Sequence, residues 1–232
     1  MKYLSIDLET TGLDPINDQI LSFSGILEDT EERKSFDECP QIDVVIVNER
    51  ISGHPYALSM NAGIISSIST HISIRSWEEK IEYSRENRRI FLEKSSLPFY
   101  FYLWCLVYLE GKKDNSDLLD PIHWICERKK LSSTIGKVAE IMNKEGKITI
   151  NVAGKNFATF DQKFLDEYPD FYKGIRIRKR VLDPAILFVD WKNDNALPGL
   201  EDCKERCGMI RDVTHNSLED AWDVIEVLRK KY

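Results

Sequence analysis

Two carboxylates near the start of the chain, Asp7 and Glu9, have the type and spacing to bind a metal ion. They follow residues 2–6, an apolar run typical of a buried strand, and side chains two residues apart on a strand point to the same face. Two like charges side by side on a core strand are costly unless a cation lies between them. The Thr-Thr-Gly that follows is a turn signal. We therefore interpret residues 7–12 as half of a site for a hard cation.

A third carboxylate, Asp161, lies at the start of an expected helix over about 159–168. It precedes Phe164 and Leu165 by three and four residues, so the three side chains would share one helical face. An alternative is that Asp161 only decorates a helix N-terminus, where negative charge is favoured. In that case Thr159 and Gln162 would form the capping box.

A fourth carboxylate, Asp220, lies in a last helix expected from about 217 to 230. It falls on the apolar side of that helix, and four residues are expected on its solvent face, namely Glu219, Asp223, Glu226 and Lys230. A Ser217-x-x-Asp220 cap is the alternative explanation. His215 precedes Asp220 by five residues, which predicts a loop position from which its ring can lean over the carboxylates.

Three blocks, in this order, carry a family resemblance. The first is Asp7-Leu8-Glu9-Thr10-Thr11-Gly12, the second is Phe160-Asp161-Gln162-Lys163-Phe164-Leu165, and the third spans 215–220 as H-x-x-x-x-D. Together they resemble the DEDDh 3′–5′ exonucleases, a family that includes proofreading exonucleases, ribonuclease T and oligoribonuclease. The resemblance covers roughly residues 1–70 and 129–232. One departure is Lys155, which stands where a histidine is common in the second block.

The resemblance implies an α/β fold of the ribonuclease-H-like class. This fold has a five-stranded mixed sheet flanked by helices, with the second strand antiparallel. An opening meander of three strands within residues 2–47 and a later alternation of helices and strands agree with it. Residues 1–232 would form a single 3′–5′ exonuclease domain, with a mostly helical inserted segment at about 70–128.

The resemblance also implies two Mg²⁺ or Mn²⁺ ions held by four acidic residues, which by position are Asp7, Glu9, Asp161 and Asp220. Such hard oxygen ligands suit these cations. In a two-metal mechanism the ions neutralise the phosphodiester and assist both the attacking water and the leaving 3′ oxygen. His215 would be the general base. The expected reaction releases nucleoside 5′-monophosphates from the 3′ end of single-stranded DNA or RNA.

Substrate contacts are expected beside the first block and before the second. The pocket for the terminal nucleotide would be lined by Thr10, Thr11, Gly12 and Leu13, and Phe157 is a candidate for base stacking. A dense basic stretch follows later, and either tracks phosphates or forms a solvated charged face. It consists of Lys173, Arg176, Arg178, Lys179 and Arg180.

Charge, cysteine content and hydropathy restrict the expected ligands and cellular location of the protein. The net charge is −7 and the pI about 5.3, so any nucleic-acid contact is local rather than global. Five cysteines, an odd number, and an N-terminus without a signal peptide favour a reduced, cytoplasmic protein. The longest apolar run, 97–109, is too short to span a bilayer, which needs about 20 residues. We expect a soluble protein with no membrane contact.

Two competing hypotheses remain at the level of sequence. One is a catalytically inactive module on this fold that docks to a polymerase or another protein. The other is an exonuclease that works in a complex, with the aromatic run 99–109 of the inserted segment as its docking surface. A buried helix is the favoured interpretation of that run. The sequence does not distinguish DNA from RNA, since the contact to the 2′-hydroxyl is not readable, and it leaves the oligomeric state open.

Overall fold

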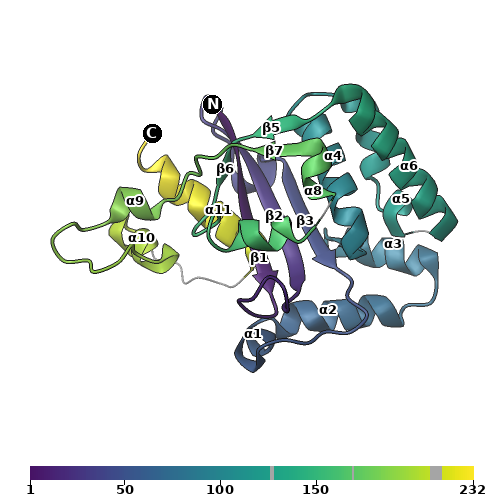
Figure 1. Ribbon diagram of the computed structural model, residues 1–232, viewed down its shortest axis with the longest axis horizontal. Helices are drawn as coiled ribbons and strands as arrows, with labels where there is room; N and C mark the ends of the chain where they lie inside the picture. The colour runs from purple at the N-terminus through teal and green to yellow at the C-terminus, as the bar shows by residue number, and fades with distance from the viewer. Residues whose placement is uncertain (126–127, 169, 210–215) are drawn as a thin grey trace.

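Five strands form one mixed sheet in the computed structural model, which describes residues 1–125, 128–168, 170–209 and 216–232 (Figure 1). The strands are β1 (Lys2–Thr10), β2 (Ile20–Asp29), β3 (Gln41–Ile46), β4 (Ile90–Leu92) and β6 (Val152–Ala153), in the spatial order β4-β3-β2-β1-β6. Within this sheet β2 runs opposite to the other four strands. The predicted mixed sheet with an antiparallel second strand is confirmed.

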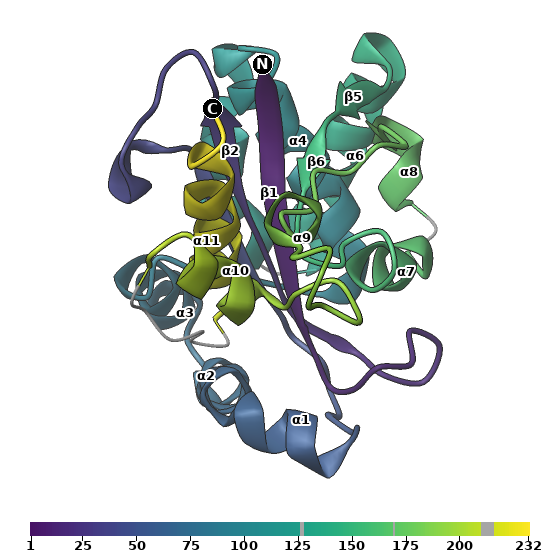
Figure 2. The same cartoon turned by 90° about the vertical axis from the view of Figure 1, so that its left-hand side faces the viewer.

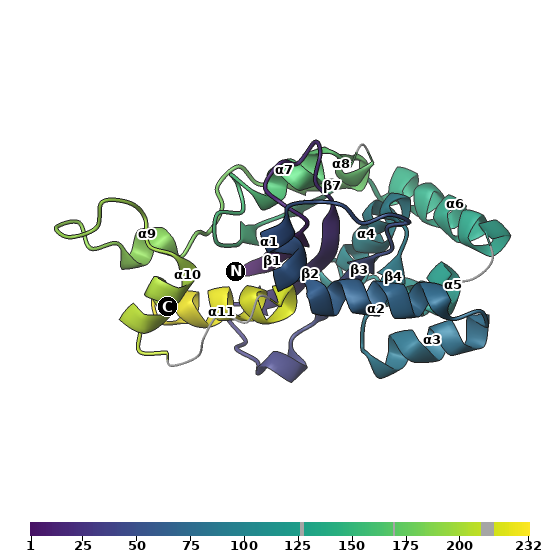
Figure 3. The ribbon, with the colours of Figure 1, turned by 90° about the horizontal axis from the view of Figure 1, so that it is seen from below.

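Helices cover both faces of the sheet (Figure 3). Their bounds are α1 (Pro55–Met60), α2 (Ala62–Ser73), α3 (Trp77–Glu86), α4 (Leu97–Tyr108), α5 (Ile122–Ile125), α6 (Arg128–Glu145), α7 (Asp161–Asp166), α8 (Phe171–Gly174), α9 (Ala185–Phe188), α10 (Leu200–Arg206) and α11 (Ser217–Arg229). Short 3₁₀ turns lie at Phe36–Glu38, Lys94–Ser96 and Lys113–Leu119. No helix within the described ranges has the length and apolar character that crossing a membrane requires.

Strand alternation divides the side chains of β1 between two environments. Leu4, Ile6 and Leu8 are buried in the largest hydrophobic cluster, together with residues of α4, α6 and α8. The opposite face carries Asp7 and Glu9 and lies under α11, which crosses β1 and β2 (Figure 2). The metal-binding face predicted for β1 therefore faces the last helix.

The segment 70–128 belongs to the core of the fold. It supplies β4, which pairs with β3 at the edge of the sheet, and α4, in which every side chain except Phe99 and Tyr108 is buried. The ring of Phe101 stacks on Phe171 with centroids 5.2 Å apart. The favoured interpretation of 99–109 as a buried helix is confirmed, and of its aromatic rings only Tyr108 is exposed and Phe99 half-buried.

Residues 148–153 form two short strands that belong to different sheets. The first, β5 (Ile148–Ile150), pairs in parallel with β7 (Ile175–Ile177) in a separate two-stranded sheet, whereas β6 pairs with β1. Asn151 lies at the break, and its Nδ2 donates to the carbonyl of Lys2 at 2.9 Å. The chain thus leaves the small sheet and enters the main one beside the start of β1.

Ion pairs hold α11 at its C-terminal end and in its middle. At its C-terminal end Arg229 makes a bidentate ion pair with the buried Glu28 of β2, with N–O distances of 2.8 and 2.6 Å. Along its length Asp223 is buried and paired with Lys204 of α10. The solvent-facing position expected for Asp223 is wrong, because α10 covers that side of α11.

Candidate metal centre

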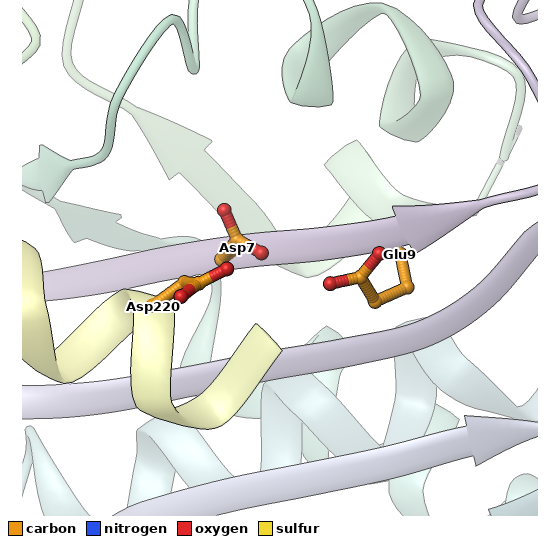
Figure 4. A group of neighbouring side chains, drawn as sticks. All are labelled: Asp7, Glu9 and Asp220. Atoms are coloured by element: carbon orange, nitrogen blue, oxygen red, sulfur yellow. The ribbon is translucent and has the colours of Figure 1, made fainter. Parts of the chain in front are cut away.

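Three of the predicted acidic ligands meet in the folded chain (Figure 4). Asp7 and Glu9 extend from β1 and Asp220 from the first turn of α11, and one carboxylate oxygen of each lies within 4.8 Å of the other two. Asp220 is only 7 % exposed, while Asp7 and Glu9 are half-buried. The strand register and the helix position together bring distant parts of the sequence into one acidic cluster.

The fourth predicted acid, Asp161, lies beside this cluster but outside the 4.8 Å group. It is the first residue of α7 and is almost fully buried, and its Oδ1 accepts a hydrogen bond of 3.1 Å from the backbone N–H of Leu8. Leu8 lies between Asp7 and Glu9 on β1, so this bond fixes α7 against the strand. The alternative capping role through Thr159 is not formed, since Phe160 is the N-cap residue.

The acidic groups raise one another's pKa values. Burial, followed by the charges of Asp161, Glu9 and Asp220, raises the pKa of Asp7 well above its usual range. Burial and the charge of Asp220 raise the pKa of Glu9 to about 8. Burial raises the pKa of Asp161 to about 7, although the bond from Leu8 opposes this shift. This accumulation of negative charge is the condition that a bound cation relieves.

His215 lies outside the described residues, so the structure does not place the predicted general base. The next residue, Asn216, is the N-cap of α11, and its Oδ1 accepts from the N–H of Leu218 at 3.1 Å. The alternative Ser217-x-x-Asp220 cap is therefore not formed. Asp220 faces the acidic cluster because it lies one turn into a helix whose first residues are held on the sheet.

A chain of hydrogen bonds, here called the serine–arginine network, holds that first turn. Ser22 and Ser24 of β2 lie opposite Glu9 and Asp7 in the strand register. Both hydroxyls bond to Ser217 Oγ, at 2.9 and 2.7 Å. The Ser24 hydroxyl also donates to Asp43 of β3.

The network ends on Arg89, which precedes β4. Its Nε donates to Asp43 Oδ2 at 2.7 Å, and its Nη2 donates to Asn216 Oδ1 at 3.4 Å. Its positive charge also lowers the pKa of Glu9, against the larger effect of burial. Sequence reasoning missed Arg89, because its partners Asp43 and Asn216 are distant in the chain.

A pocket of about 520 Å³ opens beside Glu9, between the turn after β1 and α1. Of the predicted substrate-binding residues, Thr10, Gly12 and Leu13 line it. Thr11 does not line it, because its side chain is buried and accepts from the N–H of Gln19 at 2.9 Å. Three of the four residues expected to line a nucleotide pocket thus line this hollow, and its role in binding a nucleotide stays a prediction.

Gly12 packs against a side chain of its own loop. A Cβ at this position would lie 2.2 Å from the Asp18 carboxylate, which accepts from the N–H of Asp14 and ends the turn. The absence of a Cβ at Gly12 therefore leaves room for the Asp18 side chain, in addition to any substrate that approaches the pocket.

The base-stacking role expected for Phe157 does not fit its position in the fold. Phe157 is fully buried in the main core, so it has no free ring face for a nucleobase. Phe160, half-buried, lines the pocket instead. On α1 and just after it, Tyr56, Met60 and Asn61 complete the wall. Asn61 is buried, donates to the carbonyl of Thr10 at 3.2 Å, and lowers the pKa of Glu9 by a hydrogen bond.

Solved structures of similar fold show the class of fold to which this chain belongs. The sheet order and its flanking helices are those of the ribonuclease-H-like exonuclease fold. Exonuclease I matches over 99 % of this chain and 41 % of its own, with a TM-score of 0.51 and 13 % identity.

Two further structures of the E. coli enzyme are similar. One holds a dT13 oligonucleotide and matches with a TM-score of 0.50 and 13 % identity, over 99 % of this chain and 40 % of that one. The other is a zinc-bound form of a complex with single-stranded DNA, with a TM-score of 0.50, 13 % identity, and 98 % and 39 % coverage. The chain thus spans about 40 % of the length of these structures, and the likeness establishes the fold. No known sequence family and no curated protein sequence matches the chain.

Proposed function

We propose that this protein is a metal-dependent 3′–5′ exonuclease of the DEDDh type that acts on single-stranded nucleic acid. The observation that carries the proposal is the convergence of Asp7, Glu9 and Asp220 within 4.8 Å, with Asp161 buried beside them. An exonuclease-like fold supports it, because in that fold the first strand and the last helix bring these acids to one place.

The donor set fits hard divalent cations. Carboxylate oxygens are the preferred ligands of Mg²⁺ and Mn²⁺, and no described lysine or arginine forms an ion pair with Asp7 or Glu9. Asp7, Glu9, Asp161 and Asp220 would hold two ions, which supply the positive charge that phosphodiester hydrolysis needs. His215 would accept the proton of the attacking water.

The pocket beside Glu9 would receive the 3′-terminal nucleotide. Its walls are largely apolar, with Leu13, Tyr56 and Phe160 available to contact the base. Glu9, which belongs to the acidic cluster, lines this pocket beside Thr10, whose carbonyl accepts from Asn61. Binding the last nucleotide here would bring its 5′ phosphate to the carboxylates, which supports release of nucleoside 5′-monophosphates from a 3′ end.

Single-stranded DNA is the substrate we would test first, because similar solved structures hold DNA oligonucleotides. RNA remains the alternative. The inactive docking module is less well supported, since Asp7, Glu9 and Asp220 converge and Asp161 is buried beside them. A cytoplasmic location stays a prediction.

The test is a degradation ladder on 5′-labelled single-stranded DNA and RNA of equal sequence, with Mg²⁺, Mn²⁺, Zn²⁺ or EDTA. Asp220→Asn is compared with Glu219→Gln, a matched change at the exposed neighbouring position of α11. We expect shortening from the 3′ end with Mg²⁺ or Mn²⁺, a loss of at least about 10³-fold in Asp220→Asn and none in Glu219→Gln. Intact substrate under every condition would refute the proposal.

A further inference from the structure

A second polar surface, distant from the acidic cluster, has the opposite charge. A hollow of about 900 Å³ lies on the outer face of the small sheet formed by β5 and β7. We call it the basic groove and define it by six of its lining residues, Thr149, Asn151, Arg176, Arg178, Lys179 and Arg180.

Strand alternation builds this face. Ile148, Ile150 and Ile175 point inward and are buried in the main core, whereas Thr149 and Arg176, which lie opposite each other in the register, point outward. Arg178 follows two residues after Arg176, and its N–H donates to the carbonyl of Ile150 at 2.9 Å. The two guanidinium groups therefore start from backbone positions about 7 Å apart on one face.

The charge of the groove is not compensated within the described part of the chain. None of its four basic residues forms an ion pair with a described carboxylate, and all four are exposed. Lys173, the fifth member of the basic stretch, differs because it pairs with Asp170 at 2.5 Å. What distinguishes the groove is that four basic residues without an ion pair line a single hollow, although the chain carries a net charge of −7.

We propose that the basic groove binds the phosphate backbone of single-stranded nucleic acid, upstream of the end held at the acidic cluster. Asn151 ties the groove to Lys2 at the start of β1, five residues before Asp7, and β5 and β7 lie beside the N-terminus (Figure 1). Five residues of strand span roughly 17 Å. A stacked strand advances about 3.4 Å per nucleotide, so the groove would contact phosphates about five or more nucleotides from the 3′ end. This placement rests on the proposed function, but phosphate binding by the groove does not.

The test measures oligonucleotide binding without cleavage. Fluorescence anisotropy in EDTA is recorded with 5′-labelled oligothymidylates of 20 and 3 nucleotides. The variant is Arg176→Gln with Arg178→Gln, and its control is Lys130→Gln with Lys137→Gln, which removes the same charge from exposed positions of α6. Each lost phosphate contact lowers the slope of log K against log salt by about 0.7 for single strands.

Two lost contacts correspond to a slope change of about 1.4 and, if affinities converge near 1 M salt, to roughly 25-fold weaker binding of the 20-mer at 0.1 M. We expect this loss in the groove variant alone, with trimer binding unchanged. An equal loss in the control pair, or no loss in the groove variant, would overturn the proposal.

Two further measurements, poly-glutamate binding and cleavage of the trimer, distinguish the groove from an acidic-protein site and from the active site. Poly-glutamate binding that disappears in the groove variant while binding of the 20-mer persists would assign the groove to an acidic protein and also overturn the proposal. Metal-dependent cleavage of the trimer is measured in parallel. Loss of 20-mer affinity in the groove variant upholds the groove even where no cleavage occurs, so failure of the groove and failure of the exonuclease activity are distinguishable.

Discussion

Replacing Arg89 with alanine tests whether the edge of the sheet holds the helix that carries Asp220. Arg89 and Asp43 form an ion pair of 2.7 Å with side chains 19 % and 7 % exposed. The same guanidinium reaches Asn216, the N-cap of α11. Arg89→Ala would leave the Asp43 carboxylate buried and would remove one of the contacts that hold the first turn of α11 on the sheet.

The expected cost follows from this burial. Removing one partner of a buried ion pair costs about 3–5 kcal/mol. Two features lower that figure here, because Arg89 is partly exposed and because burial already raises the pKa of Asp43, so that the carboxyl in the variant can take up a proton. We expect Arg89→Ala to reduce the free energy of unfolding by about 2–3 kcal/mol, which corresponds to a fall in Tm of roughly 4–12 °C for a chain of this size.

The assay combines thermal unfolding, calorimetric Mn²⁺ binding and exonuclease kinetics. Because the network positions Asp220, we expect Arg89→Ala to weaken Mn²⁺ binding about tenfold or more (roughly 1.4 kcal/mol) and to lower kcat, with KM for the oligonucleotide unchanged. Arg89→Lys, which keeps the charge, should recover part of the Mn²⁺ affinity. The control is Arg85→Ala, whose partner Asp120 is exposed and whose ion pair contributes about 0–1 kcal/mol.

Two results would refute this reasoning. An unchanged Tm in Arg89→Ala would show that the buried pair does not stabilise the fold. A lowered Tm with unchanged Mn²⁺ affinity would show that the pair is purely structural and that Asp220 is positioned by other contacts.

Three further predictions concern the acidic cluster, a buried histidine and the two phenylalanines. Asp7→Asn should raise Tm in EDTA at alkaline pH, where the raised pKa values of Asp7 and Glu9 matter least. The carboxylate oxygens lie within 4.8 Å of one another, so each ionised pair repels by at least about 3 kcal/mol at an effective dielectric constant of about 20. The variant should also lose the rise in Tm that Mn²⁺ gives the wild type, and a lower Tm in EDTA would contradict this. Burial and the nearby Lys80 lower the pKa of His71 to about 4. The folded protein therefore favours the neutral imidazole, and about 3 kcal/mol of the free energy of unfolding is lost as pH falls from about 6.5 to 4. Urea unfolding of His71→Phe should depend less on pH than that of the wild type, and parallel pH curves would contradict this prediction. Phe160→Ala should raise KM about tenfold and should cost less stability than Phe157→Ala, because Phe160 is only half-buried against the core. The fully buried Phe157→Ala should cost about 3–5 kcal/mol of stability and leave KM nearly unchanged. Kinetics and unfolding of both variants check this, and equal effects on KM would contradict the assignment of Phe160 to the pocket.

Local periodicity was enough to predict the elements that carry the acids. Alternation along a strand gave the shared face of Asp7 and Glu9, and helical spacing gave the inward position of Asp220. The buried helix in 97–109 followed from its nearly continuous apolar character. In each case the signal lies within one short segment, so no knowledge of the partner segment was needed.

Features that depend on contacts between distant segments could not be predicted. The strand β4 has three residues within a highly charged stretch, so neither its length nor its surroundings indicated it. The burial of Asp223 requires Lys204 of α10 to cover α11. Phe157 and Phe160 lie in an irregular connection between β6 and α7, where no period distinguishes an inward from an outward ring.

The division of the acidic cluster between the first strand and the last described helix has a consequence for protein synthesis. A chain that grows at about 5–20 residues per second needs roughly ten seconds or more to pass from Asp7 to Asp220. Until α11 docks and Arg229 pairs with Glu28, the nascent chain presents Asp7 and Glu9 without their partner from the helix. The proposed nuclease would therefore stay inactive on the ribosome, beside the messenger RNA that encodes it, until translation has passed Asp220 and the rest of α11.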